Sequence, residues 1–318
     1  MLAMKKLVLE SQGVLKLVDA PTPVATIDQE VINVELAGLG GSEYLGMANP
    51  GIRNLPNAMA HGIVGQTSTK RRVAIYPLTG CGQCPECENS TPQLCNEWQM
   101  IGVHSDGGFS QQLALPTHSL IDIPDTLSWE QTAFIEPFAN SVNAVELSDI
   151  TSENSVAVIG AGGLGLGVIA ACTAQGCSNI VTSDLSSTRI EAAQHLGGNE
   201  LLNTSTKTFD AVFDTVGSVE SRETAIKLTR KSGTCTLLGF AEPRIELDGG
   251  SFIRNQKRIV GAFAYSKDQF KSAMTLAAKT KPEWVKNLSY DEVQPQLEQF
   301  QRGNFETIKA VLRPFLTY

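Results

Sequence analysis

The feature that most constrains the fold is a glycine-rich turn that follows an apolar tetrad, Val156–Ile159, and opens a predicted helix. Glycines at this spacing permit a tight turn, and the unpaired N–H groups at a helix N-terminus attract a pyrophosphate. Asp184 ends the next apolar run, where a carboxylate accepts hydrogen bonds from ribose hydroxyls. The pattern predicts a dinucleotide-binding strand, turn and helix. The residues of the turn that we expect to contact the cofactor are Gly160, Gly162, Gly163, Leu164 and Gly165.

The residue at the end of the second apolar run also bears on which dinucleotide binds. A carboxylate at Asp184 would repel the 2′-phosphate of NADP, so the sequence favours NAD. Arg189 lies five residues further along and would bind that phosphate in the opposite case. Alternatively, Arg189 is a solvated residue on the surface of a helix.

Strands and helices alternate from Ser155 to about Phe263, a pattern typical of a parallel sheet with crossover helices. Gly197 stands where a helix that ends at Leu196 needs a left-handed residue. We expect strands at Val156–Ile159, Ile180–Ser183, Glu200–Asn203, Ala211–Phe213, Thr234–Leu238 and Arg258–Ala262. We expect helices at Leu164–Gln175, Thr188–Leu196 and Val219–Arg230.

The chain before the region of alternating strands and helices has a different sequence pattern. Short β-rich runs separated by Gly and Pro predict a barrel-like all-β domain as far as residue 125. A helix is predicted over Ser128–Ala144, because Ser128 and Gln131 form a capping box. The predicted strands are Lys6–Leu9, Leu15–Val18, Glu30–Leu36, Arg72–Tyr76, Phe109–Leu115 and His118–Ile121. After residue 266 we expect helices at Asp268–Lys279 and Tyr290–Arg302 and a last strand at Thr307–Leu312.

Composition excludes several classes of protein. A length of 318 residues suggests about two domains, and a net charge of −8 argues against nucleic acid as a partner. The uncharged stretch Asn154–Ser183 is broken by glycines and polar residues, so it does not predict a membrane span. The N-terminal segment MLAMKKLVLE lacks the apolar region of a signal peptide. We therefore expect a cytoplasmic protein.

Four of the seven cysteines lie within fifteen residues, separated by steps of 3, 3 and 8. Two-residue gaps let successive thiolates converge on one ion, and four protein ligands leave no open position, as in structural zinc sites. Two disulfides or an iron–sulfur cluster are the alternatives. Three further cysteines, Cys172, Cys177 and Cys235, are predicted to be buried in the core. The predicted zinc ligands are Cys81, Cys84, Cys87 and Cys95.

Taken together, these motifs resemble the zinc-containing medium-chain dehydrogenase/reductase family, and most closely its polyol and threonine dehydrogenase branch. The resemblance rests on the cysteine lobe Gly80–Cys95, the segment Asp106–Phe109, the linker from Ile123 to Pro137, the glycine turn and the closing strand Ile308–Pro314. It implies an α/β plus β fold, in which a GroES-like catalytic domain (1–144 and 267–318) carries an inserted Rossmann NAD-binding domain (145–266). The active site would lie between the two domains.

The chain departs from this family at the expected catalytic zinc ligands. The position of the ligand cysteine is Gly40, and the glutamate that follows the ligand histidine is replaced by Gly62. His61 and Glu136 remain, and Ser42 keeps the hydroxyl that passes the substrate proton in relatives. A zinc-free cleft is therefore predicted, because two ligands hold an ion weakly. Glu43 could act as a third ligand only by moving inward.

Each of the three surviving residues also has a plainer interpretation. His61 could be a buried histidine bonded to Glu43, Glu136 could pair within its helix, and Ser42 could be an ordinary turn residue. His104, His118 and His195 have no companions that indicate a role in catalysis.

The sequence thus predicts an NAD-dependent, alcohol dehydrogenase-like oxidoreductase for a small polar alcohol or carbonyl compound of the polyol or sugar type. Ser42, His61 and Glu136 are its candidate catalytic residues. A zinc-free reductase of an activated alkene or imine, and a catalytically silent NADH-binding protein, remain alternatives. A homodimer or homotetramer is expected, because relatives commonly pair at the sheet edge that Ile259–Phe263 would form here.

Overall fold

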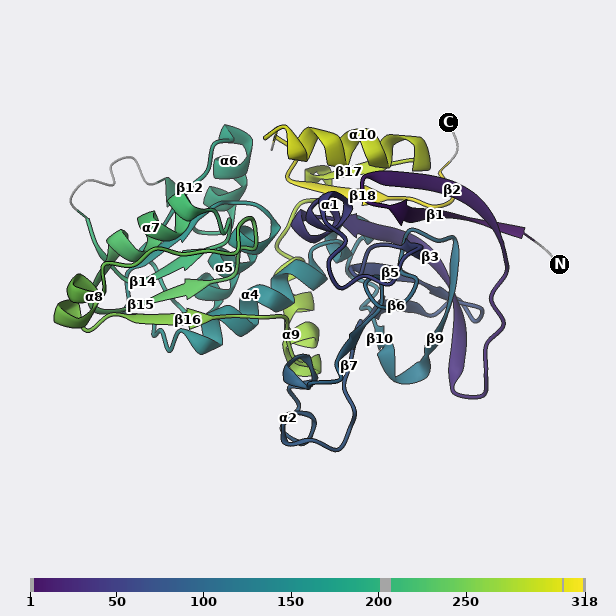
Figure 1. The fold of residues 1–318 in the computed structure, drawn as a ribbon, viewed down its shortest axis with the longest axis horizontal. Helices are drawn as coiled ribbons and strands as arrows, with labels where there is room; N and C mark the ends of the chain where they lie inside the picture. The colour runs from purple at the N-terminus through teal and green to yellow at the C-terminus, as the bar shows by residue number, and fades with distance from the viewer. Residues whose placement is uncertain (1–2, 201–206, 305, 317–318) are drawn as a thin grey trace. The chain divides into compact units, whose positions relative to one another are not determined.

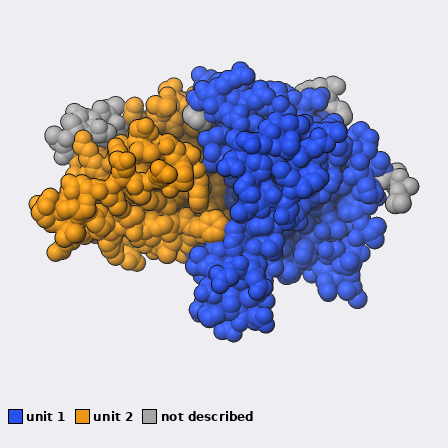
Figure 2. All heavy atoms as spheres, in the orientation of Figure 1, with its two compact units in different colours: residues 1–136, 266–318 blue, residues 137–265 orange. Residues whose placement is uncertain are grey.

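A computed structural model describes residues 3–200, 207–304 and 306–316. The chain forms two compact units, residues 1–136 with 266–318 (unit 1) and residues 137–265 (unit 2), which Figure 2 shows in separate colours. The first boundary falls after Glu136, inside a helix, and the sequence had suggested residue 144.

Unit 1 is built on a largely antiparallel sheet in which β3 (Gln29–Leu39) is the central strand. Among the described residues, the strand order is β10-β6-β5-β3-β18-β17, with β9 also paired to β3. The inward side chains of β3 alternate at first, as expected for a strand with one face against the core, and its last four residues are fully buried. The other strands of this sheet are β5 (Ile63–Thr67), β6 (Arg72–Ile75), β9 (Gln112–Pro116), β10 (Leu120–Asp122), β17 (Val285–Leu288) and β18 (Lys309–Leu312).

The strand β18 comes from the C-terminal end of the chain and pairs antiparallel with the end of β3 (Figure 1). This pairing places residues 309–312 beside residues 37–39, which are about 270 positions earlier in the sequence. A second, smaller sheet has the order β2-β1-β4, and β7 pairs with β8. Their strands are β1 (Ala3–Ser11), β2 (Val14–Pro21), β4 (Asn57–Ala58), β7 (Leu78–Thr79) and β8 (Gln99–Met100).

The helices of unit 1 come from both the N-terminal and the C-terminal parts of the chain. Those described are α1 (Gly41–Ala48), α2 (Pro85–Glu88), α3 (Trp129–Thr132), the start of α4 (Ile135–Leu147), α9 (Lys267–Ala277) and α10 (Tyr290–Gln301), with 3-10 turns at Pro92–Leu94, Thr117–Ser119 and Pro282–Trp284. No helix in the described ranges is long and apolar enough to cross a bilayer.

Unit 2 contains a parallel sheet of order β13-β12-β11-β14-β15-β16 in the described part of the chain (Figure 1). The strands at Val156–Ile159 (β11) and Ile180–Ser183 (β12) match the prediction residue for residue. The remaining strands are β13 (Asn199–Glu200), β14 (Phe209–Asp214), β15 (Thr229–Leu237) and β16 (Arg258–Gly261). The helices are α5 (Gly163–Ala174), α6 (Ser187–His195), α7 (Val219–Leu228) and α8 (Gly249–Asn255). Most of the predicted strand Glu200–Asn203 lies outside the described residues.

The single helix predicted over Ser128–Ala144 is wrong, because α3 and α4 are separate. The capping box of Ser128 and Gln131 is present, but Pro137 has no N–H to donate to the carbonyl four residues earlier. A new helix therefore starts beside the proline. The predicted strands Phe109–Leu115 and His118–Ile121 begin later than expected, at Gln112 and Leu120. The second begins late because a 3-10 turn occupies 117–119.

Candidate functional site

The first part of the site is the turn between β3 and α1. Glu43 lies in the first turn of α1, is buried, and accepts the N–H of Gly40 through Oε2 at 2.9 Å. The hydroxyl of Ser42 donates to the other carboxylate oxygen, Oε1, at 3.0 Å. Because a carboxylate at N3 of a helix satisfies an otherwise unpaired backbone donor, this contact sets where α1 begins.

The imidazole of His61 lies between two glutamates. Its Nδ1 is 3.3 Å from Glu43 Oε1, and its Nε2 is 3.3 Å from Glu136 Oε1. The Nδ1 contact is an ion pair that lies off the line of a hydrogen bond. His61 precedes β5 and Glu136 is the second residue of α4, so the row Ser42, Glu43, His61, Glu136 joins three separate segments of unit 1.

Charge pairing dominates the ionisation of this row. Burial lowers the pKa of His61, but Glu136 and Glu43 outweigh burial and raise the pKa to about 10. Burial raises the pKa of Glu43, yet His61, with smaller effects from Arg53 and Lys309, lowers it to about 2. The pKa of Glu136 is also lowered, against the effect of burial, mainly by His61. Imidazolium and two carboxylates are therefore the stable forms at neutral pH.

Lys309 is a fourth charged group of this buried cluster, and the sequence analysis missed it. Its ammonium lies beside Gly38, where an added Cβ would come within 2.9 Å of Nζ, and its hydrogen bond to the carbonyl of Leu39 measures 3.4 Å. Burial lowers the pKa of Lys309, and the charges of Glu136 and Glu43 oppose this. A lysine within the otherwise apolar run Ile308–Leu312 was the available signal, because a buried charge in a strand needs partners.

Two of the positions expected to supply catalytic zinc ligands, Gly40 and Gly62, contribute no side chain, and each nitrogen of His61 lies 3.3 Å from a carboxylate oxygen. Within the described ranges, one group of three or more His, Cys, Asp or Glu has its donor atoms close enough for a metal, and it is the cysteine group.

The four cysteines of that group converge as predicted. The sulfur atoms of Cys81, Cys84, Cys87 and Cys95 all lie within 4.8 Å of one another. Cys95 Sγ accepts the N–H of Cys81 at 3.4 Å and that of Glu97 at 3.3 Å, and these bonds lower its pKa to about 7. A thiol that ionises readily is a good zinc ligand. The remaining cysteines, Cys172, Cys177 and Cys235, are unpaired and buried as expected.

The glycine turn of unit 2 follows β11 as predicted. Gly160 has a φ of +89°, and a Cβ on Gly165 would lie 1.9 Å from the Gly160 carbonyl oxygen, so no larger residue fits there. The helix α5 begins at Gly163 with Gly162 as its N-cap, and Leu164 lies in its first turn. The backbone N–H groups of this turn can therefore come close to a bound phosphate, as a phosphate-binding turn requires.

Asp184 lies beside this turn. Its Oδ2 accepts the N–H of Ala161 at 2.7 Å, and its Oδ1 accepts the N–H of Ser186 at 2.9 Å. Arg189 Nη1 is 3.9 Å from Oδ2 and is largely buried, so it is not the solvated residue that one interpretation of the sequence suggested. Each carboxylate oxygen keeps a lone pair for a further donor.

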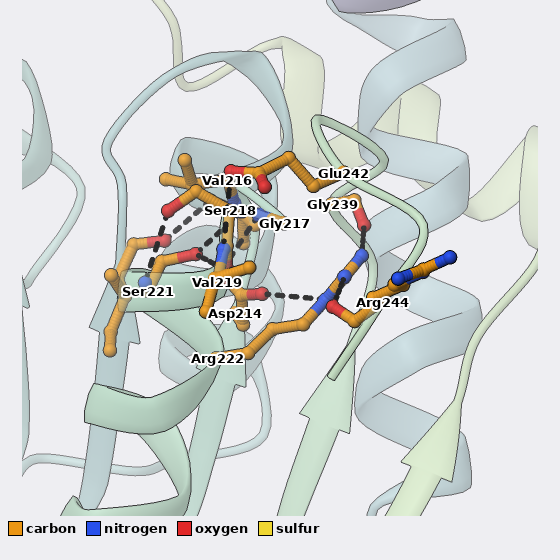
Figure 3. Close-up of polar contacts among 12 residues, drawn as sticks. Asp214, Val216, Gly217, Ser218, Val219, Ser221, Arg222, Gly239, Glu242 and Arg244 are labelled. Carbon is orange, nitrogen blue, oxygen red and sulfur yellow. Dashed lines mark hydrogen bonds and ion pairs between the residues drawn. The ribbon is translucent and has the colours of Figure 1, made fainter. Parts of the chain in front are cut away.

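A second network, also missed from the sequence, holds the loops that follow β14 and β15 (Figure 3). Arg222 of α7 donates to the carbonyls of Arg244, at 2.7 Å, and Gly239, at 3.2 Å. Asp214, at the end of β14, accepts the N–H groups of Val216 and Gly217 at 3.1 and 3.0 Å. Both loops lie at the carboxyl edge of the parallel sheet, where such folds bind their ligands.

Comparison with known proteins agrees with this architecture. Residues 27–125 match the alcohol dehydrogenase GroES-like domain, and residues 163–279 match the zinc-binding dehydrogenase family. The sorbitol dehydrogenase of Bacillus subtilis is 26% identical over 343 residues, covering 98% of this chain and 97% of that protein. The L-galactonate-5-dehydrogenase of Escherichia coli is 27% identical over 283 residues, covering 81% and 83%.

Solved structures extend the agreement to the fold. A putative zinc-binding dehydrogenase from Sinorhizobium meliloti, bound to NADP, superposes with a TM-score of 0.89 at 22% identity, covering 99% of this chain and 100% of that one. The two family matches and the relatives that cover most of the chain assign it: it belongs to the zinc-containing medium-chain dehydrogenase family and is an alcohol dehydrogenase-like oxidoreductase.

Proposed function

We propose that the protein is an NAD-dependent oxidoreductase that transfers hydride between the nicotinamide and a small polar alcohol or carbonyl compound of the polyol or sugar type. The observation that carries the proposal is the row Ser42, Glu43, His61, Glu136, in which an exposed hydroxyl is linked to a buried set of opposite charges. The names of the relatives, a sorbitol and an L-galactonate dehydrogenase, support a polyhydroxylated substrate.

Each residue of the row has a role in this proposal. The Ser42 hydroxyl donates to Glu43, so it can accept a hydrogen bond from a substrate hydroxyl, and the proton released on oxidation would pass through Ser42 to the Glu43 carboxylate. His61, held between both glutamates, fixes the Glu43 carboxylate to which the Ser42 hydroxyl donates. Bound NAD would supply the hydride acceptor.

The choice of NAD rests on Asp184. Its lone pairs can accept the two ribose hydroxyls, and its charge would repel a 2′-phosphate. The neighbour from Sinorhizobium meliloti binds NADP, which supports a dinucleotide without deciding between the two.

We further propose one structural zinc per chain, bound by the four cysteines, and catalysis without a second zinc. The convergence of the four thiols supports the first part, and the glycines at positions 40 and 62 support the second. The free thiols suit a cytoplasmic enzyme, and the edge strand β16 suits a homodimer or homotetramer.

Steady-state turnover with NAD⁺ and NADP⁺ over a panel of polyols, aldehydes and enones tests the proposal. We expect oxidation of polyols with NAD⁺ that survives a zinc chelator. Turnover on enones alone, or tight NADH binding without turnover on any compound, would contradict the proposed function.

A further inference from the structure

Arg53 lies across α1, next to the row described above, and its position is fixed. Its Nη2 donates to the carbonyl of Ser42 at 2.9 Å, and its Nη1 donates to the carbonyl of Gly102 at 2.6 Å. A Cβ at Gly46 would lie 2.2 Å from Nε, so the glycine leaves the space that the guanidinium occupies. The side chain is thus held before any ligand binds, which lowers the entropic cost of recognition.

The guanidinium keeps unused donors on a partly exposed side. Two of its five N–H groups are used by the carbonyls, and the bond to Ser42 is exposed. Among the described residues, no carboxylate lies within 4 Å of it; burial lowers the pKa of Arg53, and the charge of Glu43 opposes this from a longer distance. Gly41 has open space where a side chain would be. The backbone at Gly41, next to Ser42, is therefore open to an approaching ligand.

The charges around this face do not oppose an anion. Arg53 and Lys309 carry two positive charges, which already balance those of Glu43 and Glu136 when the imidazole is neutral. A negatively charged ligand here would meet a neutral or positive cluster, and the guanidinium offers two parallel donors to a carboxylate or phosphate.

We propose that Arg53 binds an anionic group at the end of the substrate chain, so that the enzyme acts on sugar acids or sugar phosphates in preference to neutral polyols. This inference rests on the proposed function. The carbonyl oxygen and Oγ of one serine lie roughly 3–4.5 Å apart, so Nη2 lies within roughly 7.5 Å of the Ser42 hydroxyl. That separation suits an anion a few carbons away from the carbon that is oxidised.

The test compares sorbitol, gluconate and sorbitol 6-phosphate as substrates of the full-length enzyme and of Arg53→Gln and Arg53→Lys. We expect an anionic substrate to exceed sorbitol in kcat/KM by about 100-fold, the scale of charged hydrogen bonds. Arg53→Gln should lose most of that advantage through KM, with a smaller loss of kcat/KM for sorbitol, and Arg53→Lys should retain part of the advantage. The preference between gluconate and the phosphate identifies the anionic group.

Arg71→Gln is the matched control, because Arg71 pairs with Glu30 at the surface of the same unit. It should leave the ratio between anionic and neutral substrates unchanged. A preference of the unaltered enzyme for sorbitol, or an equal loss for all substrates in Arg53→Gln, would overturn the inference and leave the proposed function standing. The comparison of anionic substrates with sorbitol on the unaltered enzyme needs no variant, so a variant that fails to fold does not affect that comparison. No turnover on any of the three compounds would remove the proposed function, and this inference with it.

Discussion

Raising the pH from 6.5 to 9 should destabilise unit 1, because His61 keeps its proton between two buried glutamates in the folded state but loses it in the unfolded state. At an effective dielectric constant of about 20, each 3.3 Å pair is worth about 5 kcal/mol before the cost of burial. A pKa raised from 6.5 to about 10 corresponds to a net gain of about 5 kcal/mol, since each pKa unit corresponds to about 1.4 kcal/mol.

Stability falls with rising pH because the pKa of His61 is higher in the folded than in the unfolded state. A group whose pKa is raised in the folded state contributes its full stability below the unfolded value of 6.5, and the contribution is lost as the pH rises toward 10. Between pH 6.5 and 9 the loss attributable to His61 is about 3 kcal/mol. Glu43, whose pKa is lowered, contributes above 4.5 and loses its contribution only as the pH falls toward 2, so it does not interfere in this window.

Urea unfolding followed by tryptophan fluorescence measures this loss, because Trp98, Trp129 and Trp284 all lie in unit 1. The comparison is between the unaltered protein and Glu136→Gln, which removes one of the two charges on His61. The variant should lose about half as much free energy of unfolding over the same pH interval. Glu30→Gln, at a surface pair with Arg71, is the control and should behave as the unaltered protein does.

A direct readout accompanies the unfolding data. Among the four histidines, the NMR signal that disappears in His61→Gln should titrate near pH 10. Titration of that signal at or below pH 6.5, or an equal pH dependence in Glu136→Gln and the unaltered protein, would refute the reasoning.

Three further results are expected. Cys95→Ser should release the zinc and lower the melting temperature, because structural zinc binding contributes roughly 10 kcal/mol or more to folding, and elemental analysis that finds no zinc in the unaltered protein would contradict this. Asp184→Ala should weaken NADH binding by about 2–3 kcal/mol and leave NADPH binding nearly unchanged in fluorescence titrations, whereas an unchanged preference would count against Asp184. Light scattering at micromolar concentration should show a dimer or tetramer that Val260→Lys dissociates, and a monomer would rule out pairing through β16.

The parts of the fold that the sequence predicted best are those encoded locally. The strands β11 and β12 were correct to the residue because each is a short buried run bounded by turn residues. The cysteine lobe and the glycine turn were also recognisable, since their chemistry depends on spacing within a few residues. By contrast, α1 begins at a glycine pair, which carries little helical propensity of its own.

The parts that were missed depend on contacts distant in sequence. Lys309 joins the cluster only because β18 pairs with the end of β3 and Gly38 leaves room for its ammonium. Arg53 reaches its position through a glycine seven residues earlier and a carbonyl 49 residues later. No local pattern encodes such pairs, although a lysine within an apolar strand marks a position where a partner is needed.

Zinc content and turnover, measured on one preparation, test the central claim most directly. The account predicts one zinc per chain, held by the four cysteines, and NAD⁺-dependent turnover that extra zinc does not raise. Removal of His61 by substitution with glutamine should abolish turnover and leave the zinc content at one. Two zinc ions per chain, with the second lost together with activity in His61→Gln, would contradict the account.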